Sequence, residues 1–233
     1  NMGLTAGIRY DMTRYDYQNH LTTGSACEPA VENCRFTRLE DQKVDFDEFS
    51  YQFGGHYLLT PNHSVYGQLS TGYRAPQATE LFRLQAGQTV AALDAEKLTS
   101  LELGIRGQWN ELFYDVTAFT MEKSDFIFQD SNRQNISNGE TSHHGIELSF
   151  YYQLPQNFYI KGSGTLVNHR YESALTLSRE NIEGNEIDTA PQHMGSVQFG
   201  WQNKTQNIAE LEWSHIGNYY LNPENSAEYE GHS

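Results

Sequence analysis

The sequence lacks long apolar runs and is poor in basic residues. None of its 233 residues belongs to a run of 18 apolar residues, and only 37% of them are hydrophobic, so a membrane-spanning helix is excluded. Lysine and arginine together number 15 against 30 acidic residues, which gives a net charge of −15. Because a surface of that sign repels phosphate, we predict that the chain has no nucleic-acid partner.

Motifs of catalysis and of metal binding are also missing. The sequence contains no G-x-S-x-G elbow, no Walker loop and no H-E-x-x-H helix, so we predict no enzyme, no catalytic residue and no cofactor. Ser142 beside His143 is the nearest candidate nucleophile, and chance adjacency explains it. No zinc or calcium spacing occurs, and we predict no metal site. His143 and His144 could bind a metal ion or haem, or they could begin a strand and face opposite sides. His169, His193 and His215 are scattered, and a site shared among them would depend on the fold.

Only two cysteines occur, Cys27 and Cys34, in a polar segment that contains glycine and proline. A disulfide between them would close a small ring and stabilise the chain by roughly 2.5 kcal/mol in the chain-entropy model. We expect this disulfide, which implies an oxidising compartment. Two free thiols or a metal-binding pair are the alternatives.

What the sequence does contain is an alternation of apolar and polar residues that recurs along its whole length. Leu4, Ile8 and Met12 face one way, for example, while Arg9 and Asp11 face the other. This period of two predicts strands at residues 4–12, 49–59, 65–74, 101–109, 112 onward, 146–153, 158–166, 196–202 and 209–214. The fifth is less regular, because Phe113 and Phe119 share a face with Asp115 and Thr117. No charged residue falls on the apolar face of these nine segments.

The connections between these segments alternate between short and long. Short ones lie at residues 60–63, 110–111, 155–157 and 203–207, and long polar ones at about 15–45, 75–97, 127–143 and 171–192. Transmembrane barrels have short turns at one end and long loops at the other, whereas a soluble sandwich has no reason to place its long loops at one end. We therefore predict an all-β fold, an antiparallel transmembrane β-barrel of which about nine or ten strands are present.

Three stretches resemble the barrel segments of TonB-dependent outer-membrane receptors. Residues 49–82 show a strand, a T-P turn and a strand that ends in G-[FY]-R-A-P before an E-L-[FY] element; the matching residues include Tyr73, Arg74, Ala75, Pro76 and Glu80. Residues 98–107 and 114–127 resemble the next hairpin of these receptors, and residues 213–233 a late strand and loop.

The resemblance implies a barrel of about 22 strands with a plugged lumen, of which residues 1–233 would form a part. We recognise no plug domain and no closing strand in the sequence. A receptor of this kind lies in the bacterial outer membrane among its lipids and imports a scarce nutrient. Its TonB-type energising partner acts through the plug. Residues 77–97 lack the N-P-N-L motif of haem receptors, which favours an iron–siderophore complex as the ligand. A passive porin-like barrel is the alternative, and an outer-membrane enzyme is a weaker one.

The resemblance also places the ligand at the outer loops. We expect the binding surface at residues 18–45, 77–97 and 171–192, with Tyr17, Arg83 and Tyr220 as exposed candidates for ligand contact. Arg74 and Glu80 flank Pro76 and have two interpretations: an ion pair that orients the loop toward the ligand, or a wall network that keeps charged groups paired.

Overall fold

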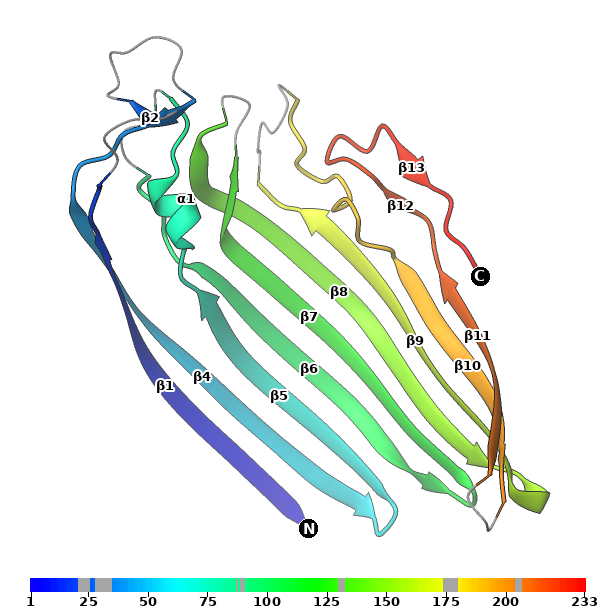
Figure 1. Cartoon of the computed structure of the whole chain (residues 1–233). Coiled ribbons are helices and arrows are strands. Elements are labelled where there is room, and N and C mark those ends of the chain that lie inside the picture. Colours follow the sequence, from blue (N-terminus) through cyan, green and yellow to red (C-terminus); the bar gives the residue numbers. More distant parts are fainter. Residues whose placement is uncertain are drawn as a thin grey trace.

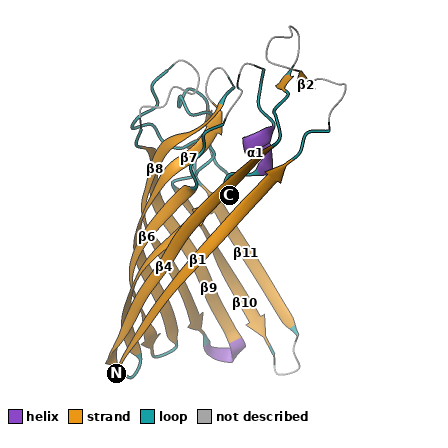
Figure 2. Cartoon of the chain, turned by 90° about the vertical axis from the view of Figure 1, so that its left-hand side faces the viewer, coloured by secondary structure: helices purple, strands orange, loops and turns teal. Residues whose placement is uncertain are grey.

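The computed structural model describes residues 1–20, 26–27, 35–86, 88, 91–129, 133–173, 180–203 and 207–233. A single sheet of nine strands dominates it, each strand antiparallel to its neighbour in chain order. The sheet is strongly curved and resembles part of a cylinder wall (Figure 2). All nine predicted strands are present. They are β1 (Met2–Tyr17), β4 (Gln42–Thr60), β5 (His63–Arg74), β6 (Glu96–Trp109), β7 (Leu112–Gln129), β8 (Asn135–Gln153), β9 (Phe158–Tyr171), β10 (His193–Gln202) and β11 (Ile208–Ile216).

The two ends of the sheet differ as the lengths of the connections predict. The short turns lie at the lower end in Figure 1 and the long connections at the upper end. A two-residue turn, Asn110 and Glu111, joins β6 to β7, and Asn110 adopts a positive φ of 53°, as the favoured two-residue hairpin turns do at their first central residue. The lower end also contains the 3-10 turn η1 (Pro155–Asn157).

Small elements decorate the upper end. They are the helix α1 (Ala78–Phe82), the parallel pair β2 (Ala26–Cys27) and β3 (Phe36–Thr37), and the antiparallel pair β12 (Tyr219–Tyr220) and β13 (Glu228–Tyr229). Within the described part of the chain, no helix has the length and apolar character needed to cross a membrane.

The strand register separates the sheet into an apolar and a polar face. On the apolar face, large side chains such as Leu103 and Leu211 are 60% and 74% exposed. Arg106 lies opposite Asp115 on the polar face. That face lines a hollow of about 830 Å³ near the short turns. The irregular phase of the fifth segment is confirmed, because Phe113 shares the polar face with Asp115 and lies opposite Tyr151.

The two faces exchange character toward the upper end. On the apolar side, Arg14 lies 2.8 Å from Asp45, and Lys43 lies 3.0 Å from Asp16. Val44, which alternates with these charges, lies on the opposite side and is half-buried. The strands therefore continue beyond the last exposed apolar residues, with their side-chain pattern inverted.

This inversion corrects the predicted long loops. Residues 15–17 and 42–45 belong to β1 and β4, and most of residues 127–143 belong to β7 and β8. The prediction ended these strands where the apolar residues changed sides. The backbone hydrogen bonds of the sheet do not depend on which side is apolar, and the pairing runs on to Tyr17 and Gln42.

The inverted region buries two small hydrophobic clusters under the upper connections. We call the first the α1 cluster; it consists of Leu81, Leu93 and Ile127, with Tyr15, Val44, Phe46, Phe82 and Ala91 packed against them. The second is the Tyr171 cluster; it consists of Phe128, Tyr171 and Ile182, with Phe126, Ile136 and Ile187. These clusters give the upper connections a core of their own.

A bulge in β7 leads into both clusters. The register between β7 and β8 shifts after Lys123, and Asp125 adopts a positive φ of 56°. An extra residue in one strand bends that strand and redirects the side chains that follow it. The strand tip beyond the bulge buries Ile127 in the α1 cluster and Phe128 in the Tyr171 cluster.

One close approach on the polar face allows a direct test of the packing. A Cβ at Gly104 would lie 2.3 Å from the ring of Tyr66, whose hydroxyl donates a hydrogen bond of 2.6 Å to Asp115. We expect Gly104→Ala to displace this ring and lower the free energy of unfolding by about 1–3 kcal/mol. Gly7→Ala is the control, because a Cβ there meets nothing within 4 Å. Thermal unfolding followed by circular dichroism measures both, and equal melting temperatures would contradict the packing described.

Candidate functional site

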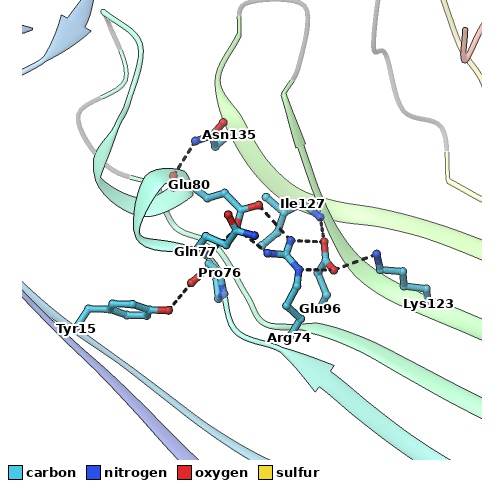
Figure 3. Close-up of polar contacts among 9 residues, drawn as sticks. All are labelled: Tyr15, Arg74, Pro76, Gln77, Glu80, Glu96, Lys123, Ile127 and Asn135. Carbon is cyan, nitrogen blue, oxygen red and sulfur yellow. Dashed lines mark hydrogen bonds and ion pairs between the residues drawn. The ribbon is translucent and has the colours of Figure 1, made fainter.

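Arg74, the last residue of β5, links two carboxylates at the upper end of the sheet (Figure 3). Its Nε and Nη2 donate to Glu96 at 2.9 and 2.7 Å, and its Nη1 and Nη2 donate to Glu80 at 2.9 and 3.2 Å. Lys123 Nζ lies 3.0 Å from Glu96, and the backbone N–H of Ile127 donates to the same carboxylate at 2.9 Å. A planar guanidinium group suits such paired contacts better than an ammonium group does.

The electrostatics of this network centre on Glu96. Its side chain is only 5% exposed. Burial by itself would raise the pKa of Glu96, but hydrogen bonds from Arg74, the Ile127 amide and Lys123 outweigh it and lower the pKa to about 2. The same contacts, with Glu96 first and Glu80 second, raise the pKa of Arg74. Both groups are therefore charged at neutral pH.

The network holds the short helix α1 in place. A helix of five residues is too short to be stable on its own, so its ends must be fixed by other contacts. Glu80 accepts a hydrogen bond of 2.6 Å from the backbone N–H of Gln77, which caps the first turn. Pro76, just before the helix, is fully buried, and its carbonyl accepts a hydrogen bond of 2.8 Å from the hydroxyl of Tyr15.

A second set of contacts ties the segment around α1 to the beginning of β8. Asn135 Nδ2 donates to the carbonyl of Glu80 at 2.7 Å. The side chain of Gln88 donates to the Asn135 carbonyl at 2.9 Å and accepts from its N–H at 3.0 Å. Buried amide groups that pair in this way fix the path of the connection between β5 and β6.

The third segment to join is residues 35–37, from the first long connection. Thr37 N–H donates to the carbonyl of Leu84 at 2.9 Å, and Ala86 N–H donates to the carbonyl of Arg35 at 3.1 Å. Thr37 Oγ1 also donates to the Gln85 carbonyl at 2.9 Å. Two connections that lie far apart in sequence thus pair through their backbones above the sheet.

This pairing creates what we call the Arg83 pocket, a hollow of about 400 Å³ at the upper end. The guanidinium groups of Arg35 and Arg83 lie 5.2 and 4.7 Å from the ring centroid of Phe36. Within the described residues, neither guanidinium has a carboxylate within ion-pair distance, whereas Glu80, which also lines the pocket, is paired with Arg74. Other lining residues are Thr79, Gln85, Gln129 and Asn135. Positive charge and polar groups therefore converge there on a chain that is otherwise strongly acidic.

The structure brings two of the three predicted contact residues near each other. Tyr17 stacks on Phe82 with ring centroids 4.6 Å apart, and Phe82 directly precedes Arg83. Tyr220 lies instead in β12, on the opposite side of the sheet in Figure 1, where its carbonyl accepts from Thr189 N–H at 2.7 Å. Among the described residues, Tyr220 is not part of the lining of the Arg83 pocket.

The remaining predicted positions have separate outcomes. The residues of the family motif lie where β5 leads into α1. Tyr73 and Arg74 end β5, Ala75 and Pro76 follow it, and Glu80 belongs to α1. The disulfide between Cys27 and Cys34 stays a prediction, because Cys34 lies outside the described residues.

Sequence reasoning missed Arg35, Phe36, Glu96 and Lys123. Glu96 could have been found by extending the pairing of β5 with β6, since the register places it opposite Arg74. In the pairing of β6 with β7, Lys123 lies opposite Leu98, which is two residues from Glu96 and on the same face, so the register alone brings Lys123 only near Glu96. Nothing in the sequence connects Phe36 to Arg83, because these residues meet only through the pairing of two long connections.

A family model described as "TonB dependent receptor-like, beta-barrel" matches residues 1–232. The chain belongs to this family. Three solved receptors share its fold. The ferric citrate transporter FecA is 18% identical with a TM-score of 0.76, and covers 100% of this chain and 34% of its own. PiuA of Acinetobacter baumannii and Fiu of E. coli K12 are each 17% identical with TM-scores of 0.71 and cover 99% of this chain.

The match covers only a part of each receptor. The chain spans 33% of the length of PiuA and 34% of the length of Fiu, about a third in each case. At these identities the likeness establishes the fold alone. The family's members are transporters and receptors and not enzymes, and its barrels lie in bacterial outer membranes.

The charge on Glu96 predicts how the site responds to acid. Because the pKa of Glu96 is depressed in the folded chain, its stabilising contribution is present above about pH 4.5 and is lost as the pH falls toward 2. We expect residues 76–86 to lose protection from hydrogen exchange in that window, after correction for intrinsic exchange rates.

Glu96→Gln is the matched control for this experiment. It keeps the shape of the side chain and removes the titrating group, so protection should be lower at neutral pH and nearly independent of pH between about 4.5 and 2. An unchanged acid response in Glu96→Gln would show that another group holds this connection.

Proposed function

We propose that this chain forms part of the barrel of an outer-membrane receptor that imports an anionic iron chelate of the siderophore class. The chain belongs to the receptor family, and the proposal adds where the receptor lies, which ligand it imports and what supplies the energy. A TonB-type complex would supply the energy through a plug domain inside the barrel, in contact with the polar face. The exposed apolar face of the sheet would contact lipid.

The charge of the Arg83 pocket is the main support for the proposed class of ligand. Ferric complexes of catecholates and of citrate are negatively charged, and a pocket that holds two guanidinium groups attracts such ligands. The fixed pairing of residues 35–37 with residues 84–86 holds the two groups around one ring, which lowers the cost of ordering them on binding. The solved receptors PiuA, FecA and Fiu are described as a siderophore receptor, a ferric citrate transporter and a ferric-catecholate import receptor. These descriptions agree with the charge of the pocket.

Tyr17 and Phe82 form an aromatic pair that adjoins Arg83 in the chain and lies outside the lining of the pocket. Their rings stack almost in parallel, with an interplanar angle of 13°. Aromatic side chains bind flat ligands by stacking and lose little conformational freedom when they do. A catecholate ring could therefore lie against this pair while its charge lies near Arg83.

The transport proposal is tested with the intact receptor in cells that lack their own receptors for the ligand. We expect accumulation of radiolabelled iron supplied as a catecholate or citrate complex, and we expect an uncoupler of the proton gradient to abolish it. Uptake that continues in the presence of the uncoupler would overturn the energised mechanism and support a passive barrel.

The ligand contact is tested separately by equilibrium binding to the purified receptor. We expect Arg83→Ala to weaken the affinity for ferric catecholate about tenfold, which corresponds to about 1.4 kcal/mol. Arg83→Glu should weaken it further, because it reverses the charge. Arg14→Ala is the matched control, since Arg14 forms an exposed pair with Asp45 away from the pocket. A neutral iron chelate should bind all four proteins alike, and equal losses in Arg83→Ala and Arg14→Ala would contradict the assignment.

A further inference from the structure

His143 and His169 meet across β8 and β9. They are directly opposite each other in the register, and their Nδ1 atoms lie 2.7 Å apart. The ring centroids are 5.0 Å apart and the planes cross at 69°. Since both Nδ1 atoms point at the same place, one of them must carry a proton that the other accepts. Two imidazole nitrogens thus converge on a single point.

The pair lies on the polar face, just above the last exposed apolar residues. His143 alternates in β8 with His144, whose Nδ1 is 2.7 Å from Thr120 Oγ1 on the other face. Opposite His143 in β7 is Met121. The register therefore aligns a thioether and two imidazoles across three neighbouring strands, all of them half-buried.

A further contact sets the state of the His143 ring. Its Nε2 lies 3.1 Å from Thr141 Oγ1. If Nε2–H donates to this hydroxyl, Nδ1 carries the lone pair and can act as a metal ligand. Histidine ligands in metal sites are commonly oriented in this way by a hydrogen bond to the second ring nitrogen.

The spacing of the two nitrogens is close to what a metal ion requires. In a tetrahedral site with metal–nitrogen distances of 2.0–2.1 Å, two ligand nitrogens lie about 3.3 Å apart. The pair needs to open by only about 0.6 Å, which a small rotation of either ring provides. A metal ion would then replace the shared proton.

We propose that His143 and His169 bind a transition-metal ion that prefers imidazole, with Met121 as a neighbouring soft donor. Imidazole suits zinc, copper and nickel, and a thioether adds preference for copper. Over the described ranges, no group of three His, Cys, Asp or Glu side chains converges. The other coordination positions are thus open to water or to donors of an incoming ligand. The nearby cation Lys123 lies 3.0 Å from the carboxylate of Glu96, which offsets its charge. This proposal does not rest on the proposed import of an iron chelate.

The test uses the intact receptor in detergent, titrated with Cu²⁺ alone and followed by electron paramagnetic resonance. We expect one equivalent to bind with the hyperfine signature of two nitrogen ligands. His143→Ala and His169→Ala should each weaken this binding at least tenfold and remove one nitrogen from the signature. Met121→Leu should leave Zn²⁺ binding unchanged and weaken binding of Cu⁺.

His144→Ala is the matched control, because His144 is the adjacent histidine and faces the other side of the sheet. It should bind Cu²⁺ like the parent protein. Where an alanine variant folds poorly, His143→Gln and His169→Gln replace it, since they keep a polar group at the same place. The proposal is overturned if the bound copper shows no two-nitrogen signature, or if His144→Ala loses as much affinity as His143→Ala.

Discussion

The ladder of backbone hydrogen bonds across nine antiparallel strands is the constraint on which the rest of the molecule depends. Each of the seven strands from β4 to β10 pairs with a neighbour on both sides, and the pairing of β1 with β4 runs through sixteen residue pairs without a break. These backbone hydrogen bonds form in the same way whether a side chain is polar or apolar. The ladder fixes only that alternate residues lie on opposite faces, and the sequence decides what each face contacts at each level.

The sequence uses this freedom by exchanging the two faces at the upper end. Below the exchange, the polar face carries groups such as Arg106 and Asp115 and the other face is apolar. Above it, charged pairs such as Arg14 and Asp45 lie on the formerly apolar side, and Val44 and Phe46 lie on the other. The connections can then bury Leu81 and Leu93 against the strands themselves. Loops that would otherwise depend on local turns acquire a core, and this core positions Arg83 beside Phe36.

The sequence predicts those parts of the fold whose sequence patterns extend over only a few neighbouring residues. The nine strands and their short turns follow from alternation and turn residues, both of which can be read within a few positions. The upper ends of the strands were missed, because Lys43, Val44 and Asp45 alternate in the opposite phase. Tyr17 and Arg83 were chosen as exposed candidates, and their proximity through Phe82 required the fold. Phe36 offered no signal, since its position depends on the pairing of two distant connections.

The bulge at Asp125 has a consequence for the packing of two upper connections. Consecutive residues at the tip of β7 pack in different clusters. Ile127 packs against the connection that contains Arg83, whereas Phe128 packs against the connection that contains Ile182. The tip of β7 therefore contributes to the core of both connections. Two connections that lie more than fifty residues apart in sequence therefore share one strand tip in their packing.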